Sequence, residues 1–167
     1  MRWALAIPVL VLELVIAVTG ACGRLAEVVQ NTHPLTGEIA EEFEVYRDPL
    51  AQEPIRHGFY RSYYADGTPK ESGQYRDGAR VGEWKSAYPS GHTRKRGRYE
   101  DGKEHGTWIA YRADGRIRWQ RSFAHGRKSG EWIYYHGNGQ KLRVENYRGG
   151  ILDGACASYH ENGQIEE

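Results

Sequence analysis

The sequence predicts an all-β protein: an antiparallel β-hairpin repeat array that forms a single-layer meander, preceded by an N-terminal signal helix. Three glycine series that recur every 24 residues carry this prediction, together with aromatic residues in the same phase. The series are Gly58, Gly82, Gly106, Gly130 and Gly154; Gly67, Gly91, Gly115, Gly139 and Gly163; and Gly78, Gly102, Gly126 and Gly150. Repetition at a fixed period of this length indicates units that each pack only against their neighbours.

The second and third glycine series predict where the chain reverses. Asp66-Gly67 and Asn138-Gly139 exemplify the second series, and such turn glycines supply the positive backbone angles of tight hairpin turns. Asp77-Gly78 and its equivalents mark the second reversal of each unit. Because a lone hairpin is only marginally stable in water, we expect the units to join into one continuous sheet.

Aromatic residues predict what stabilises this sheet. If both turns contain two residues, Trp84 lies opposite Gly97, and its ring covers the gap that a bare glycine leaves in a strand. The same register puts Trp108 opposite Lys95 of the preceding strand. Each ring buries about 150 to 250 Å². The predicted structural aromatics on this face are Tyr60, Trp84, Trp108, Trp132, Tyr75, Tyr99, Phe123 and Tyr147.

The repeat unit, G-x-W-x-x-Y-x-x-(D/N)-G followed by Y-x-x-G, resembles the MORN-repeat variant of bacterial proteins of the YwqK antitoxin type. The residues that carry the resemblance are Gly82-Glu83-Trp84, Tyr88, Ser90-Gly91, Tyr99, Asp101-Gly102, Gly130-Glu131-Trp132, Tyr135, Asn138-Gly139, Tyr147 and Gly150. The resemblance covers residues 36–167 and implies an elongated β-hairpin array that serves in protein interaction, sometimes near membranes. The antitoxin label implies sequestration of a partner toxin.

Residues 1–21 are predicted to be a signal peptide. Arg2 supplies the charged start, residues 3–18 form an apolar run, and Thr19-Gly20-Ala21 are small residues before Cys22. This ending resembles the bacterial lipoprotein signal, in which the cysteine sulfur is acylated, so the resemblance implies membrane attachment through an acyl chain on Cys22. A cleaved secretory signal and an uncleaved anchor are the alternatives. At about seventeen residues, the anchor is near the short limit for spanning a membrane.

The remaining chain divides into three predicted parts. Residues 22–35 lack a strong period and are predicted to be a tether, partly helical over 25–29. Residues 36–57 resemble a degenerate half-repeat, with a strand over 41–47, that covers the open N-terminal edge of the array. Residues 58–167 hold four full repeats and a terminal half-repeat. Residues 22–56 contain 7 acidic and 3 basic residues, whereas the repeats are moderately basic.

No catalytic motif is visible in the sequence. The histidines show no metal-ligand spacing, so we expect no metal site, and His57 and His105 are predicted to be solvated turn residues. Cys156 takes the position of a tryptophan and is predicted to be buried rather than reactive. No serine has a nucleophile-elbow setting. We therefore expect neither an enzyme nor a cofactor.

A basic cluster on the face opposite the aromatics is the candidate binding patch. Its arginines are Arg94, Arg96, Arg98, Arg116 and Arg118. Such a patch suits an acidic protein segment, anionic lipid or envelope glycans, and the alternative is a solvated face that discourages edge pairing. Export disfavours a nucleic-acid partner. The sequence thus predicts a non-enzymatic, exported, lipid-anchored scaffold that binds a protein in the cell envelope, or alternatively an antitoxin or immunity-type protein that neutralises a cognate toxin.

Overall fold

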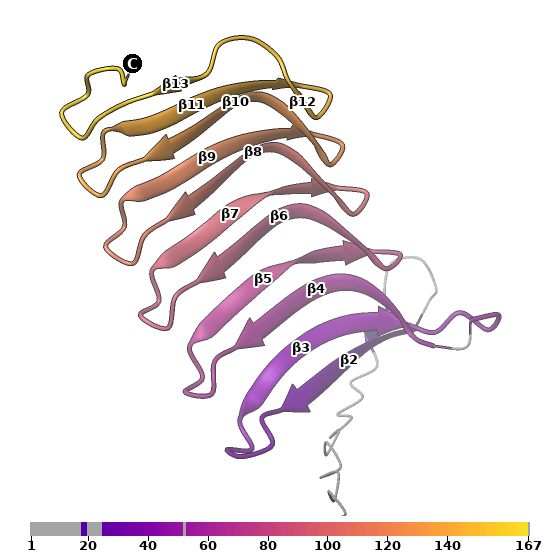
Figure 1. Ribbon diagram of the computed structural model, residues 1–167. Coiled ribbons are helices and arrows are strands. Elements are labelled where there is room, and N and C mark those ends of the chain that lie inside the picture. Colours follow the sequence, from indigo (N-terminus) through magenta and orange to yellow (C-terminus); the bar gives the residue numbers. More distant parts are fainter. Residues whose placement is uncertain (1–17, 20–24, 52, 167) are drawn as a thin grey trace, which may run out of the picture.

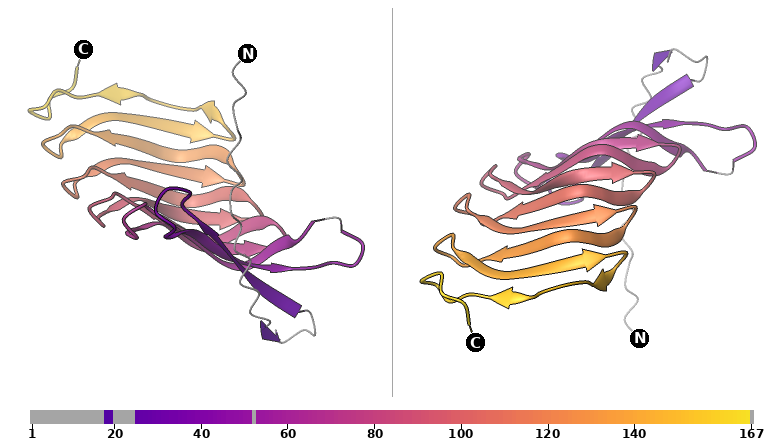
Figure 2. Two further views of the ribbon diagram at one scale, coloured as in Figure 1. Left: turned by 90° about the horizontal axis from the view of Figure 1, so that it is seen from below. Right: turned by 90° about the horizontal axis from the view of Figure 1, so that it is seen from above.

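The computed structural model describes residues 18–19, 25–51 and 53–166. It confirms the all-β prediction, because these residues form one 13-stranded sheet in which neighbouring strands are antiparallel and follow the order of the chain. Figure 1 shows the long strands side by side in one open layer, with the N-terminal and C-terminal strands at opposite ends. Figure 2 shows that this layer twists along its length. The predicted signal helix lies outside the described residues, apart from Val18 and Thr19.

The strand bounds follow the 24-residue period from the fourth strand onward. The strands are β1 (Val18–Thr19), β2 (Leu25–Thr32), β3 (Ile39–Tyr46), β4 (Ile55–Tyr63), β5 (Pro69–Arg76), β6 (Ala79–Ala87), β7 (Thr93–Glu100), β8 (Lys103–Tyr111), β9 (Ile117–Ala124), β10 (Arg127–Tyr135), β11 (Lys141–Arg148), β12 (Ile151–Leu152) and β13 (Ala157–Ser158). Strand β13 pairs with β11. In the part of the chain that the structure describes, no helix is long and apolar enough to cross a membrane.

The two kinds of turn lie at opposite ends of the strands, and these two rows of turns are here called the turn edges of the sheet (Figure 1). The turns β5–β6, β7–β8 and β9–β10 contain two residues with positive φ, as at Asp77 (49°) and Gly78 (81°), which is the geometry of a type I′ hairpin. The turns of the other edge are longer. Between β6 and β7 the Tyr88 amide donates to the His92 carbonyl at 2.8 Å, which leaves three residues between them. The prediction of two-residue turns is therefore right at one edge and wrong at the other.

A β-bulge at the opening glycine of each of the first four units changes the strand register. Between β7 and β8 the pairing jumps from Arg98↔His105 to Arg96↔Ile109, so β8 carries two extra residues. Gly106 lies in this bulge with φ of 69°, a left-handed backbone conformation that side chains disfavour. The opening glycines are therefore required by backbone geometry, in addition to marking the period.

The bulge brings Trp84 over Gly73 and Trp108 over Gly97, each a glycine of the preceding strand. Trp84 pairs with Gly97 as predicted. The prediction for Trp108 is wrong: Lys95 pairs with Ala110 instead, and a Cβ atom at Gly97 would overlap the Trp108 indole ring. The two-residue slip is the reason. Trp84 and Trp108 expose only 2% and 3% of their surface, so both rings are buried although the protein is a single sheet.

The predicted tether is wrong for residues 25–32. This segment is strand β2 and pairs with β3 along its length, with Val29 opposite Phe43. Phe43 belongs to the buried aromatic cluster, and Val29 packs against that cluster. A helix over 25–29 would remove this contact, which explains why the segment extends the sheet.

Cys156 is exposed, so its predicted burial is wrong. It occupies the tryptophan position of the last unit, but the chain around it does not form a long strand. Strand β12 ends at Leu152, and the pairing resumes only at Ala157 in β13. Without a long strand at this position, the bulge that buries the equivalent tryptophans is not completed.

Candidate binding face

Alternation along the strands divides the sheet into two faces. The aromatic face carries Tyr60, Trp84, Trp108, Trp132, Tyr75, Tyr99, Phe123 and Tyr147, and these rings contact one another along the array. The opposite side, here called the basic face, carries Arg94, Arg96 and Arg98 from β7 and Arg118 from β9. All four are exposed. Arg116 precedes β9 in the turn.

The aromatic face uses its charged groups internally. The Arg80 guanidinium lies 3.9 Å from the ring centroid of Trp84 and pairs with Glu71 at 3.2 Å. Lys95 repeats the arrangement, 4.1 Å from the Trp108 centroid. Burial raises the pKa of Tyr99 above its ordinary value, so its phenol is neutral near pH 7. Each cation is already engaged by a ring or an acid, which indicates that this face stabilises the fold.

The basic face presents arginines that no described acid engages. Among the described residues, none accepts a hydrogen bond or forms an ion pair with the arginines of this group: Arg94, Arg96, Arg98 and Arg118. Lys85 and Arg96 are direct cross-strand partners on this face. Like charges in this position are destabilising, so a bound anion would relieve a repulsion that folding leaves in place.

Arg116 differs from the rest of the predicted patch. Its guanidinium donates to the Gly137 carbonyl at 2.6 Å and lies 3.9 Å from the Asp114 carboxylate. The structure therefore places Arg116 at the turn edge, where it joins two neighbouring turns. Its hydrogen bond makes it less available to a ligand than the strand arginines.

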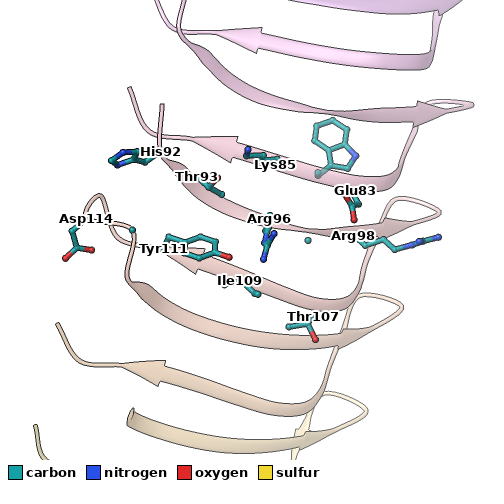
Figure 3. Close-up of a pocket in the computed structure, with 13 residues that line it drawn as sticks. Glu83, Lys85, His92, Thr93, Arg96, Arg98, Thr107, Ile109, Tyr111 and Asp114 are labelled. Atoms are coloured by element: carbon teal, nitrogen blue, oxygen red, sulfur yellow. The ribbon is translucent and has the colours of Figure 1, made fainter. Parts of the chain in front are cut away.

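A shallow, open groove crosses the basic face over β6, β7 and β8 (Figure 3). Its volume is about 780 Å³. Arg96 and Lys85 line it beside Ile109 and Tyr111, and the Arg96 guanidinium lies 5.8 Å from the Tyr111 ring centroid. An arginine held near an aromatic ring can bind a carboxylate through two parallel hydrogen bonds while the apolar surface contacts the rest of the ligand.

The N-terminal end of the same face is neutralised by acids. Glu42 accepts hydrogen bonds from Tyr63 at 2.7 Å and Arg61 at 3.2 Å. Burial alone would raise the pKa of Glu42, but these hydrogen bonds outweigh it and hold the pKa below its ordinary value. The strand arginines Arg94, Arg96 and Arg98 lie beyond this acidic end, in β7, where the groove lies.

A ladder of hydrogen bonds along the longer turns was not predicted. Tyr64 and Tyr88 donate through their hydroxyls to the carbonyls of Ala87 and Tyr111, each at 2.8 Å and 23 residues further along. Arg112 and His136 occupy the equivalent positions and contact the carbonyls of Tyr135 and Tyr159. The sequence signal was present, since the turn tyrosines follow two series one residue apart rather than one series. The ladder holds neighbouring turns in place beside the groove.

The structure also groups residues that the sequence kept apart. The ligand atoms of Glu100, His105 and His125 all lie within 4.8 Å of one another. The expectation of no metal-ligand grouping among the histidines is therefore wrong, and His105 is half-buried rather than a solvated turn residue. The pairing of β7 with β8, and of the two adjacent turns, brings the three together. Cys22, the predicted lipidation site, lies outside the described residues.

Comparison with known families matches three segments of the chain to the MORN repeat variant: residues 56–77, 128–148 and 152–167. The same strand pairing, bulge and turn geometry continue between these segments. These three segments are therefore similar to MORN repeats, and the chain between them keeps the same repeat geometry. No curated protein matches it.

Proposed function

We propose that this MORN-repeat protein is a non-enzymatic scaffold of the cell envelope, and that its basic face binds an acidic segment of a partner protein. MORN repeats are generally protein- or membrane-binding repeats. The observation that carries the proposal is the set of strand arginines with no acceptor among the described residues, beside a groove that offers apolar contacts.

The groove favours a peptide over a bare anion. Ile109 and Tyr111 lie beside Arg96, so a ligand with both carboxylates and apolar side chains would contact the cations and the apolar part of the lining. Glu83 and Asp114 also line the groove, so basic or polar side chains of the same segment would complement them. Adjacent strands lie about 4.8 Å apart, and residues on one face of a strand repeat at about 6.6 Å. An extended acidic segment that lies along a strand has the side chains of one face at the same spacing of about 6.6 Å, so its carboxylates can meet successive cations of β7.

A peptide-binding experiment tests the proposal. A fluorescent peptide that combines glutamates with two aromatic residues should bind the full chain, with an affinity that falls as salt rises. The double variant Arg96→Glu with Arg98→Glu should weaken binding at least tenfold. Lys141→Glu with Arg148→Glu is the matched control, because it makes the same charge change on β11, away from the groove. Equal losses in both double variants would show attraction to net charge alone and contradict the proposal.

The envelope location rests on the leader of the chain. We propose that residues 1–21 direct export and that an acyl chain on Cys22 attaches the protein to a membrane. The small residues before Cys22 support lipidation. Labelling cells with a clickable fatty acid should mark the wild type and leave Cys22→Ala unlabelled. Label on both proteins would exclude Cys22 as the acylation site.

Neutralisation of a toxin is the alternative function, supported by the resemblance of the repeat to YwqK-type antitoxins. The basic face would then hold an acidic surface of the toxin. Deletion of the gene together with its neighbouring reading frames should be harmless, whereas deletion of this gene alone should be toxic. Viability of the single deletion would favour the scaffold.

A further inference from the structure

We propose that Glu100, His105 and His125 form a binding site for one divalent transition-metal ion of the zinc class. Glu100 ends β7, His105 lies in β8, and His125 opens the two-residue turn between β9 and β10. Figure 1 shows the β7–β8 and β9–β10 turns as neighbours on one edge of the sheet. The Gly126 amide donates to the Glu104 carbonyl at 2.8 Å, which ties the two turns together.

The distances between the side chains fit metal coordination. The Glu100 Oε2 atom lies 3.2 Å from Nδ1 of His105 and 3.5 Å from Nδ1 of His125. Zinc bonds to nitrogen and oxygen are about 2.0 to 2.2 Å long, so the ligand atoms of a tetrahedral site lie about 3.3 to 3.6 Å apart. Both of these separations are close to that value, and the ligand atoms of the two histidines lie within 4.8 Å of each other.

The state of the His105 ring points to a missing ligand. Its Nδ1 atom is buried and has no hydrogen-bond partner, although the Glu100 carboxylate lies only 3.2 Å away. The two groups are therefore close but not oriented to share a proton. A buried polar atom in this state is destabilising, and coordination of an ion would satisfy it.

The backbone at His125 supports the same interpretation. His125 has φ of 48°, in the left-handed region. Asp77, Asp101 and Gly149 occupy the equivalent positions in the other turns. Asparagine, aspartate and histidine are the residues other than glycine that adopt positive φ most readily, so this turn accepts a histidine ligand where the equivalent turns have aspartate or glycine. The turn brings the His125 ring to 4.9 Å from the His105 ring, measured between centroids.

Comparison with the neighbouring units shows that the ligand set is local. The unit before has Val81 and Asp101 at the two histidine positions, and the unit after has Ser129 and Gly149. The first unit has His57 and Asp77, whose side chains lie 3.3 Å apart. Asp77 also accepts a hydrogen bond from the Tyr46 hydroxyl. Over the described residues, the three-ligand group occurs where the second unit meets the third.

Two histidines and one carboxylate suit zinc, with water completing the coordination. The site is open to entry, because the side chains of Glu100, His105 and His125 expose 44%, 38% and 70% of their surface. The strand pairing places two cations next to the ligand residues: Arg98 pairs with His105, and Lys103 pairs with Glu100. Their charges oppose the ion, so Lys103→Gln should tighten binding severalfold.

Metal titration of the untagged full chain tests the proposal. Zinc should bind in a one-to-one ratio in competition with a chromogenic chelator, and cobalt should give the visible absorption of a low-coordinate site. The test variants take their residues from the equivalent positions of other units: Glu100→Ala, His105→Val and His125→Gly. Each should weaken zinc binding at least tenfold. His57→Val is the matched control and should leave affinity unchanged.

Thermal unfolding distinguishes loss of the site from loss of the fold. Without metal, His125→Gly should unfold at or above the wild-type temperature, because glycine accepts positive φ without strain. Zinc should then raise the unfolding temperature of the wild type and of His57→Val, and not that of His125→Gly. Absence of stoichiometric zinc binding by the wild type, or equal weakening by His57→Val and His125→Gly, would overturn the proposal.

Discussion

The two faces of the sheet differ in how their charged groups are used. On the aromatic face, Arg80 covers Trp84 and pairs with Glu71. On the basic face, Lys85 and Arg96 stand opposite each other, and no described residue neutralises either through a hydrogen bond or an ion pair. A single-layer sheet has no interior, so one face must supply the stabilising burial. The other face can then carry charges that destabilise the isolated protein and are available to bind a ligand.

Among the tests of this difference between the two faces, removal of a buried ring should change the unfolding free energy most. Trp84→Ala deletes a side chain that is 2% exposed and contacts rings on both sides, so we expect a loss of about 3 to 5 kcal/mol in unfolding free energy. Urea denaturation measures it. Lys85→Ala changes the adjacent residue on the basic face and should shift stability by less than about 0.5 kcal/mol. Similar losses in the two variants would contradict the division of roles.

A glycine substitution tests the packing of the aromatic face by adding a side-chain atom beneath a ring. In Gly97→Ala, the new Cβ atom would overlap the Trp108 ring, and we expect destabilisation of about 1 to 3 kcal/mol. Gly97 does not have positive φ, so the penalty is steric. Gly137→Ala is the control, because its Cβ atom would meet nothing within 4 Å and its φ is also not positive. A neutral Gly97→Ala variant would show that the ring can move away.

The turn ladder should contribute less than the rings. Tyr88→Phe removes the hydroxyl that donates to the Tyr111 carbonyl at 2.8 Å, and we expect a loss of about 0.5 to 1.5 kcal/mol in chemical denaturation. Among the described groups, none forms a hydrogen bond with the Tyr111 hydroxyl, so Tyr111→Phe is the control and should be nearly neutral. Equal costs would mean that the ladder does not hold the turns.

The smallest expected effect is a difference between the two ends of the basic face in how stability depends on pH. The pKa of Glu42 is lowered in the folded protein, so its hydrogen bonds stabilise the fold above about pH 4.5, and this contribution is lost as pH falls through the lowered pKa. Glu42→Gln should flatten the stability profile below pH 5 in acid titrations followed by tryptophan fluorescence. Glu83→Gln, on the exposed middle of the face, should leave the profile unchanged.

The periodic features of the fold could be predicted residue by residue. The glycine series located both kinds of turn, and the pairing of Trp84 with Gly97 followed from counting between them. Strand β2 could not be found in this way, because its pattern does not repeat and its place depends on contact between Val29 and Phe43. Cys156 kept the phase of the tryptophans but lacked the strand that buries them.

The candidate sites were predictable to different degrees. The alternation of Arg94, Arg96 and Arg98 within one strand was enough to place them on one face, because side chains alternate along any strand. The Glu100, His105 and His125 group was not visible, since these residues come from two strands and a separate turn. Their approach depends on how adjacent hairpins stack.

The sequence alone determined that the chain reverses at regular glycines and that rings cover one side of the resulting meander, because turn geometry and strand alternation are local properties. Only the tertiary structure decided which residues meet across strands. The bulge at Gly106 shifts part of the pairing between β7 and β8 by two residues. Trp108 therefore lies over Gly97 instead of Lys95. Such a slip depends on how strands fit against one another, and residue spacing along the chain does not report it.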